Sequence, residues 1–190
     1  DEIEEIVVSA SYIDPALGDI ENPLHVVSGD DLEAMATQSL GDALDNLLGV
    51  GSTDYGSAVG QPIIRGMSGN RVKILNNGMV IRDVSNLGAD HINDIDLNDI
   101  QQIEVVKGPS SLLYANGTTG GIINVVDDAI ARKDFTDSVL SIGLEGQSVN
   151  DGTSSNLSYK NNIGGLNLSL ALKNSKFGNF NIPDGAIHSE

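Results

Sequence analysis

Alternating apolar and polar residues mark the last third of the chain. Leucines, isoleucines and one tyrosine alternate with small or polar residues in three runs, at 140–145, 157–163 and 166–173. A period of two predicts β-strands with one apolar face and one polar face. Gly164 and Gly165 predict a two-residue hairpin between the second and third strands. The Asn-, Asp-, Gly- and Ser-rich stretch at 147–155 predicts a longer loop between the first two.

The first half of the chain carries a helical pattern after one short strand at Leu24–Ser28. Ser28 or Asp30 is a suitable N-cap, because a side-chain oxygen there accepts from the first free backbone amides. Apolar residues then recur at helical spacing, namely Leu32, Met35, Ala36, Leu40, Ala43, Leu44, Leu47 and Leu48. The pattern predicts one helix over 31–48 or, because Gly41 divides it, two short helices over 31–36 and 40–47.

The middle of the chain predicts a small sheet with tight turns. Residues 61–65 form an extended run, and Asn77-Gly78 between 71–75 and 79–82 is the strongest short hairpin signal. Two apolar strands follow at 103–106 and 122–126. Their connection is dense in glycine, which suits a backbone that turns sharply in little space.

Composition narrows the classes of function. The 190 residues suit one domain or one and a half, and 10 basic against 27 acidic residues leave a net charge of −17. This charge argues against nucleic acid and against adhesion to anionic lipid, and it suits attraction of cations. The absence of cysteine excludes a disulfide scaffold and thiolate-bound zinc. No apolar run reaches the 18 residues of a membrane-spanning helix.

The common catalytic patterns are missing from the sequence. There is no GxxxxGK[ST] phosphate loop, no GxSxG nucleophile turn and no HExxH metal motif. We therefore expect a protein that is not an enzyme and that holds no cofactor of its own.

One loop offers ligands for a cation. Asp90 and His91 stand side by side, and acidic residues follow at 94, 96 and 99. A carboxylate beside an imidazole suits zinc, whereas several carboxylates in one loop suit calcium. A solvated acidic loop with ordinary turn residues is the alternative interpretation.

The stretch 103–126 resembles the core motif of the plug domain in TonB-dependent outer-membrane receptors. The family pattern runs IE, two apolar residues, RGP, then LYG, then GGxIN. Here it is carried by Ile103, Glu104, Gly108, Pro109, Leu113, Tyr114, Gly117, Gly120, Gly121, Ile123 and Asn124. Lys107 replaces the usual Arg and Ala115 replaces the usual Gly, and neither change removes the charge or a required turn glycine.

Two further stretches are similar to the same family: LGDALDNLLGV at 40–50, and the run containing Ile64, Arg65, Gly66 and the Asn-Gly turn. The resemblance implies an α+β plug domain with a small mixed sheet, followed by the first antiparallel strands of a transmembrane β-barrel. Plugged barrels of this kind have about 22 strands, so the 190 residues should be the N-terminal part of a longer protein or one piece of a split one. The implied domains are 1–20 with the TonB box and a linker, 21–133 with the plug, and 134–190 with the first barrel strands and loops.

The resemblance also implies partners. Alone, the apolar patch near the N-terminus suggests a frayed strand. Within this family it resembles the TonB box, which adds as a strand to a TonB-type energy-coupling protein of the inner membrane. The residues are Glu5, Ile6, Val7, Val8, Ser9 and Ala10. The apolar face of the strands at 140–173 would contact outer-membrane lipid, which places the protein in the bacterial outer membrane.

Charged residues inside apolar strands need partners or solvent. Arg65, Arg71, Glu104 and Lys107 are such residues. In the family, charges of this kind form ion pairs between plug and barrel wall, which would act as a releasable lock. Solvent-facing strand positions are the alternative.

The run from Asn70 to His91 resembles the zinc-uptake subgroup of these receptors, whose Asp-His pair on a plug loop binds the metal. This implies Asp90 and His91 as ligands, and His188 is a further candidate without a supporting motif. The expected function is import of a scarce nutrient, a metal ion such as zinc. The alternatives are a ferric-siderophore or haem receptor of the same fold, a soluble periplasmic metal-binding domain, and a sensing module that signals through its N-terminus.

Overall fold

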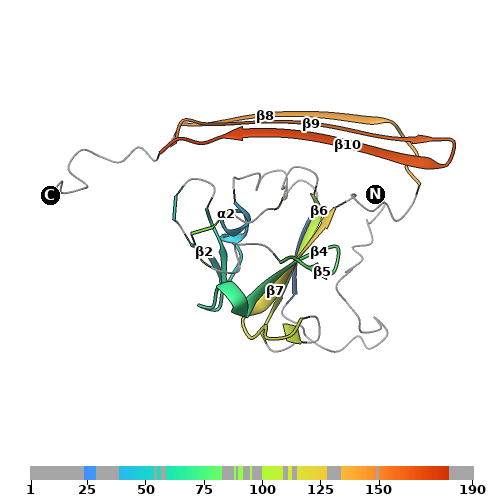
Figure 1. The fold of residues 1–190 in the computed structure, drawn as a ribbon. Helices are drawn as coiled ribbons and strands as arrows, with labels where there is room; N and C mark the ends of the chain where they lie inside the picture. Colours follow the sequence, from blue (N-terminus) through green and yellow to red (C-terminus); the bar gives the residue numbers. More distant parts are fainter. Residues whose placement is uncertain are drawn as a thin grey trace. The chain divides into compact units, whose positions relative to one another are not determined.

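The computed structural model describes residues 24–28, 39–53, 55–56, 59–82, 88, 90–91, 95, 100–108, 111–112, 115–127, 134–148 and 150–179. The chain forms two compact units (Figure 1). The first comprises Asp1–Tyr55 and Val59–Asp128, and the second comprises Gly56–Ala58 and Ala129–Glu190.

The secondary structure of the described residues is mostly strand. The elements of the first unit are β1 (Leu24–Ser28), α2 (Leu40–Leu44), β2 (Val50–Ser52), β3 (Pro62–Ile64), the 3₁₀ turn η1 (Gly69–Arg71), β4 (Val72–Asn76), β5 (Met79–Val80), β6 (Ile100–Lys107) and β7 (Gly121–Asp127). Those of the second are β8 (Val139–Gln147), β9 (Gly152–Ile163) and β10 (Leu166–Lys176).

The first unit is built on a mixed sheet in the order β1-β6-β7-β4-β5. The pair β4 and β7 is parallel, and the other neighbours are antiparallel. This confirms the predicted small mixed sheet, the strand at Leu24–Ser28 and the strands at 103–106 and 122–126. The predicted hairpin is also present: Asn77 and Gly78 have φ of 49° and 82°, the left-handed values that a tight two-residue turn requires.

One face of the sheet carries the larger apolar core. Ile103 and Val105 of β6 and Ile123 and Val125 of β7 point to the same side, because alternate residues of a strand share a face. They pack with Val27, Leu40, Leu44, Ile64 and Val72. Figure 1 shows α2 and β2 on one side of the sheet, and the core lies between these layers.

The opposite face combines a small apolar cluster with a buried polar group. The cluster consists of Leu75, Val106, Ala115 and Ile122. Beside it, Glu104 of β6 and Asn124 of β7 stand opposite each other in the register, and both have no exposed surface. Asn124 Nδ2 donates to Glu104 Oε2 at 2.9 Å, and Gln102 Nε2 donates to Glu104 Oε1 at 2.5 Å. Both carboxyl oxygens therefore have amide donors, as a buried charged group requires.

The same polar group holds the β4–β5 hairpin against β7. The backbone N–H of Gly78 donates to Asn124 Oδ1 at 2.8 Å. At the end of β7, the carboxylate of Asp127 accepts from Asn76 Nδ2 at 3.0 Å and from Asn77 Nδ2 at 2.7 Å. The hairpin is thus fixed by side-chain bonds at its turn in addition to the strand ladder.

Helix α2 is shorter than predicted, which corrects the helix over 40–47. It begins after Ser39, whose Oγ accepts from the Asp42 N–H at 3.1 Å, and its C-cap is Asp45. The Leu47 N–H then bonds to the Leu44 carbonyl, three residues back, so the chain tightens out of the α-helix. The other predicted helix, over 31–36, and the proposed N-cap Asp30 lie outside the described residues, and the alternative cap Ser28 is the last residue of β1.

The extended run predicted for 61–65 ends one residue early, at Ile64. Arg65 has φ of 52° and Gly66 has φ of 76°. The flanking residues Ile64 and Met67 exchange two backbone hydrogen bonds of 2.9 Å. Arg65 therefore sits at the first position of a tight turn, in a backbone conformation that is unfavourable for a residue with a Cβ.

The second unit is an antiparallel three-stranded sheet in the order β10-β9-β8. The hairpin at Gly164 and Gly165 is confirmed, with φ of 62° and 89°. The loop between the first two strands is shorter than predicted. β8 continues to Gln147 and β9 starts at Gly152, because residues 152–155 pair with 144–147 in spite of their polar composition.

The second sheet has one continuous apolar face. The register aligns Leu140 with Tyr159 and Leu170 in one row across the strands, and Ile142 with Leu157 and Leu172 in the next. Apart from the half-buried Tyr159, these side chains are exposed, an arrangement typical of strands that face lipid. Among the described residues, no helix is both long and apolar enough to span a membrane.

The hydrogen bonds of the buried Glu104–Asn124 group should make a measurable contribution to the free energy of unfolding of the first unit. Asn124→Leu removes one donor from the Glu104 carboxyl and the acceptor of the Gly78 N–H, and an unsatisfied buried polar group costs roughly 1–3 kcal/mol. We expect Asn124→Leu to lower the free energy of unfolding by about 3 kcal/mol, measured by urea unfolding with circular dichroism. The matched control is Asn116→Leu at an exposed position. Equal losses for the two variants would contradict the assigned role of the Glu104–Asn124 contact.

Candidate functional site

The predicted ligands Asp90 and His91 lie together on a turn. The His91 N–H bonds to the Gly88 carbonyl at 3.3 Å, which closes the turn. Asp90 Oδ1 lies 2.9 Å from His91 Nδ1. The side chains are 69% and 45% exposed, respectively, so both face solvent. A metal held by both side chains would take the place of this hydrogen bond, with an Asp90 oxygen and a ring nitrogen of His91 as its donors.

The contact changes the acidity of Asp90. The hydrogen bond with the His91 ring, then the bond from its own backbone amide and the charge of His91, hold the pKa of the Asp90 carboxyl below its usual value. A depressed pKa means that the contact is present at neutral pH and above, and is lost as pH falls through the lowered pKa. The carboxylate is therefore ionised and able to bind a cation at neutral pH.

Two ligands do not complete a zinc site, which commonly has four. Within the part of the chain that the structure describes, no group of three or more His, Cys, Asp or Glu residues stands close enough to hold a metal. The acidic residues at 94, 96 and 99, which would favour calcium, lie outside that part. Asp90 and His91 alone therefore do not make a metal site, and a cation held there would need further donors.

Sequence reasoning missed the residue that holds this turn. The Gln61 side chain is 4% exposed, and its Nε2 donates to the Gly88 carbonyl at 2.8 Å and the His91 carbonyl at 3.3 Å. A glutamine directly before Pro62 is the only signal in the sequence, and it does not indicate a partner 27 residues away.

Lys107 and Arg65 lie close together, but Lys107 is buried whereas Arg65 is exposed to solvent. Lys107 is buried, and its Nζ donates to the Leu48 carbonyl. Burial, followed by the charge of Arg65, lowers the pKa of Lys107. Arg65 is exposed, and its Nη1 lies only 2.6 Å from where a Cβ on Gly108 would be. Burial and then Lys107 also lower the pKa of His25.

The other two charged residues of the predicted ion pairs are also placed. Arg71 is exposed at the end of η1. Glu104 lies inside the sheet, where its carboxyl accepts the two amide bonds described above. Ion pairs with a barrel wall stay a prediction for all four residues, and the exposed Arg65 and Arg71 are the better placed to form them.

Two other candidates cannot be placed. The predicted TonB box, with Glu5, Ile6, Val7, Val8, Ser9 and Ala10, and the extra histidine His188 lie outside the described residues. Their roles stay predictions.

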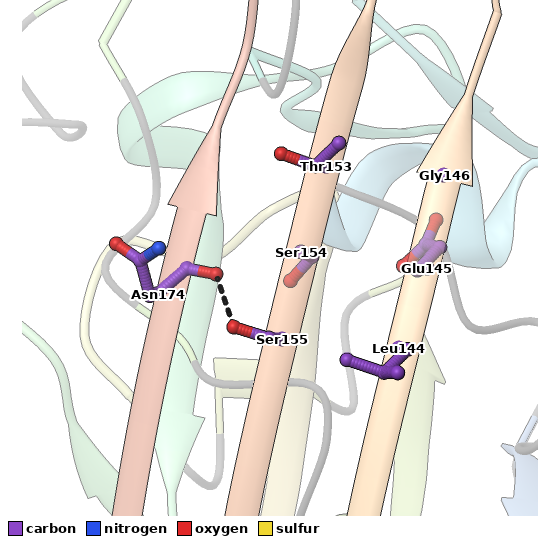
Figure 2. Close-up of a pocket in the computed structure, with 7 residues that line it drawn as sticks. All are labelled: Leu144, Glu145, Gly146, Thr153, Ser154, Ser155 and Asn174. Carbon is purple, nitrogen blue, oxygen red and sulfur yellow. Dashed lines mark hydrogen bonds between the residues drawn. The ribbon is translucent and has the colours of Figure 1, made fainter.

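The second unit contains a shallow pocket over its three strands, shown in Figure 2. Its lining consists of Leu144, Glu145, Gly146, Thr153, Ser154, Ser155 and Asn174. Ser155 Oγ donates to the Asn174 carbonyl at 3.5 Å, so part of its polar surface is already used within the sheet. With Glu145 as the only ionisable side chain of the lining, we assign no ligand site here.

The fold therefore consists of a mixed-sheet domain that is followed by long antiparallel strands with an exposed apolar face. Residues 16–122 match the model of the TonB-dependent Receptor Plug Domain. The chain belongs to this family, so it is a TonB-dependent receptor of the outer membrane of Gram-negative bacteria. Its first unit is the plug, and the strands of its second unit are the start of the barrel.

Curated relatives agree with this family. Over 123 residues the chain is 28% identical to the vitamin B12 transporter BtuB of Photobacterium profundum. This match covers 64% of the chain and 20% of the relative. Over 145 residues it is 28% identical to the vitamin B12 transporter BtuB of Vibrio vulnificus, covering 74% of the chain and 23% of the relative. The chain thus spans about a fifth of the length of the curated relatives that it matches.

Solved structures share the fold at lower identity. The copper transporter OprC matches 72% of the chain, and 21% of its own length, with a TM-score of 0.57 and 23% identity. The ferric-catecholate import receptor Fiu from E. coli K12 matches 82% of the chain, and 21% of its own length, with a TM-score of 0.59 and 22% identity.

The Asp90–His91 contact predicts a lowered titration midpoint for the Asp90 carboxyl. We expect the Asp90 carboxyl to titrate below the usual value of about 3.9 for aspartate, measured by carbon NMR and assigned with Asp90→Asn. His91→Phe keeps a ring at the position but removes its nitrogens and charge, so the midpoint should rise towards the usual value, with the backbone bond still lowering it. A midpoint that does not move in His91→Phe would show that the two side chains are not in contact in solution.

Proposed function

We propose that this receptor imports a scarce metal ion, and that the metal is zinc. The observation that carries the proposal is the Asp90–His91 pair, an ionised carboxylate and an imidazole 2.9 Å apart on an exposed turn of the plug. A carboxylate and an imidazole are ligand types that zinc takes in proteins, and the chain has no cysteine to offer thiolate instead. The net charge of −17 favours accumulation of cations near the protein.

The remaining ligands would come from other loops of the receptor. The metal would bind first to a plug turn that faces outward, and the barrel loops would complete the coordination. A TonB-type protein would then pair with the segment containing Ile6 and Val7 and pull on the plug. The plug would rearrange and open a path to the periplasm. This sequence of steps requires binding and mechanical work but no covalent chemistry.

A ferric-siderophore or haem receptor is the second candidate, because several similar structures are named for siderophores. A metal chelate brings its own ligands, so it would not require Asp90 and His91 as donors. The soluble metal-binding domain is not favoured, because the chain belongs to an outer-membrane family and the three strands of its second unit present an unpaired apolar face.

The cargo proposal predicts a ligand-specific loss of affinity. We expect Asp90→Ala and His91→Ala each to weaken zinc binding to the detergent-solubilised receptor by at least about tenfold, measured by isothermal titration calorimetry. His25→Ala is the matched control, because it removes a histidine from β1 in the same unit and should leave zinc affinity unchanged. If zinc binds equally to all of these variants while a ferric chelate competes with it, the siderophore assignment replaces the zinc assignment.

The coupling proposal predicts that uptake depends on backbone pairing at residues 5–10. Successive N–H groups of a strand point to opposite edges, so one of two adjacent residues must donate to an added strand. Val7→Pro with Val8→Pro removes both donors, and uptake of radioactive zinc should stop while zinc binding persists. The control pair Val7→Thr with Val8→Thr keeps the donors and should sustain uptake. Normal uptake by the proline variant would contradict the assignment of the TonB box.

A further inference from the structure

A buried side-chain amide connects the turn that carries Asp90 and His91 to the strand pair β2 and β3. Gln61 Nε2 lies 2.8 Å from the Gly88 carbonyl oxygen and 3.3 Å from that of His91. The bond between the His91 N–H and the Gly88 carbonyl closes the turn itself. One side chain thus holds both ends of the turn that presents Asp90 and His91, although the ligands themselves are exposed.

The backbone of Gln61 is fixed by the strand pair β2 and β3. Its N–H donates to Thr53 Oγ1 and its carbonyl accepts from the Thr53 N–H, each at 2.9 Å, so the β2–β3 ladder extends by one residue beyond Ser52 and Pro62. Proline at the next position also restricts Gln61 to extended backbone conformations. The amide is therefore held at the end of a rigid hairpin.

Helix α2 restrains the residue before Gln61. The Gly60 carbonyl accepts from the Gly41 N–H at 3.0 Å, in the first turn of α2. A Cβ on Gly41 would be 2.8 Å from the Gly60 carbonyl carbon and oxygen, so glycine permits this close approach of helix and loop. The position of the amide thus depends on the core-packed helix as well as on the hairpin.

The space around Gly88 is matched to the two candidate ligands. A Cβ on Gly88 would be 2.5 Å from Asp90 Oδ1 and 3.2 Å from His91 Nδ1. Glycine here leaves room for the carboxylate and the ring to meet over the turn. No positive φ is needed at this residue, so the requirement is steric and concerns the two side chains.

From these contacts we propose that Gln61 is a positioning residue of the cation site, in a role that rests on the proposed function of Asp90 and His91. It does not touch the metal. It orders the turn before binding, so that the carboxylate and the imidazole meet an incoming cation in one arrangement. Residues that orient metal ligands in this way typically change affinity by about 10–100-fold when they are replaced.

The decisive variant is Gln61→Met, which keeps the length of the side chain and removes both N–H donors. We expect zinc affinity of the detergent-solubilised receptor to fall by about 10–100-fold, measured by isothermal titration calorimetry. Gln61→Glu places acceptor oxygens against two carbonyls, so this variant should lose at least as much zinc affinity as Gln61→Met. Gln101→Met makes the same chemical change at an exposed position on β6, so it controls for the substitution itself. Its affinity should remain within about threefold of the wild type.

A second readout separates this proposal from the cargo proposal, because it needs no zinc. Selective ¹⁵N-histidine labelling reports the His91 amide, with the His25 amide in β1 as an internal reference. A rigid backbone amide has an order parameter of about 0.85 and a flexible one lies below about 0.6. In the metal-free receptor, Gln61→Met should lower the order parameter of the His91 amide from the rigid range towards the flexible range. The order parameter of the His25 amide should stay unchanged.

The outcomes distinguish the two proposals. If Asp90→Ala and His91→Ala abolish zinc binding while Gln61→Met binds zinc as the wild type does, the positioning role is wrong and the cargo proposal stands. If no variant affects zinc binding but Gln61→Met frees the His91 amide, the turn is anchored as proposed and its cargo is not zinc. An unchanged His91 amide in Gln61→Met overturns the positioning role in either case.

Discussion

A carboxyl group and an amide meet without solvent exposure at the centre of the plug, and the rest of the domain depends on this contact. Glu104 and Asn124 are opposite partners on β6 and β7, the two most extensively paired strands of the sheet. Polar groups in such a position are stable only while each finds a partner. Because Asn124 also accepts from the Gly78 N–H, the contact fixes the β4–β5 hairpin as well as the central strand pair.

This contact holds the two strands between which the segment with the candidate cation turn runs. The segment that carries Asp90 and His91 leaves the sheet after β5, at Val80, and returns to it at the start of β6, at Ile100. The Glu104–Asn124 group holds both of these strands, and Gln61 holds the turn between them. The plug thus presents the two candidate ligands from a segment that is held at both ends by the sheet and at the turn by Gln61. A turn that is ordered before binding favours affinity, because less conformational freedom is lost on binding.

Local chemistry made much of this fold predictable from sequence. The strand at Leu24–Ser28, the Asn77-Gly78 and Gly164-Gly165 turns and the alternation along β8, β9 and β10 each depend on neighbouring residues. The errors occurred where distant contacts decide the structure. The polar residues at 152–155 were assigned to a loop because their composition is typical of loops, but they pair with β8. The anchor of the site was missed for the same reason: Gln61 is separated from Gly88 by the two hairpin strands β4 and β5, and no local pattern connects them.

The account is tested most directly by locating the metal itself. Crystals of the complete receptor grown with zinc would be measured on both sides of the zinc absorption edge, and the difference would give the position of every bound zinc ion. The expected result is a strong anomalous peak about 2.0–2.1 Å from a ring nitrogen of His91, the usual zinc–nitrogen distance, with an Asp90 oxygen at about 2.0–2.2 Å in place of its hydrogen bond to the ring. A peak elsewhere in the receptor, with Asp90 and His91 still paired only to each other, would contradict the central claim that this plug turn is where the cargo binds.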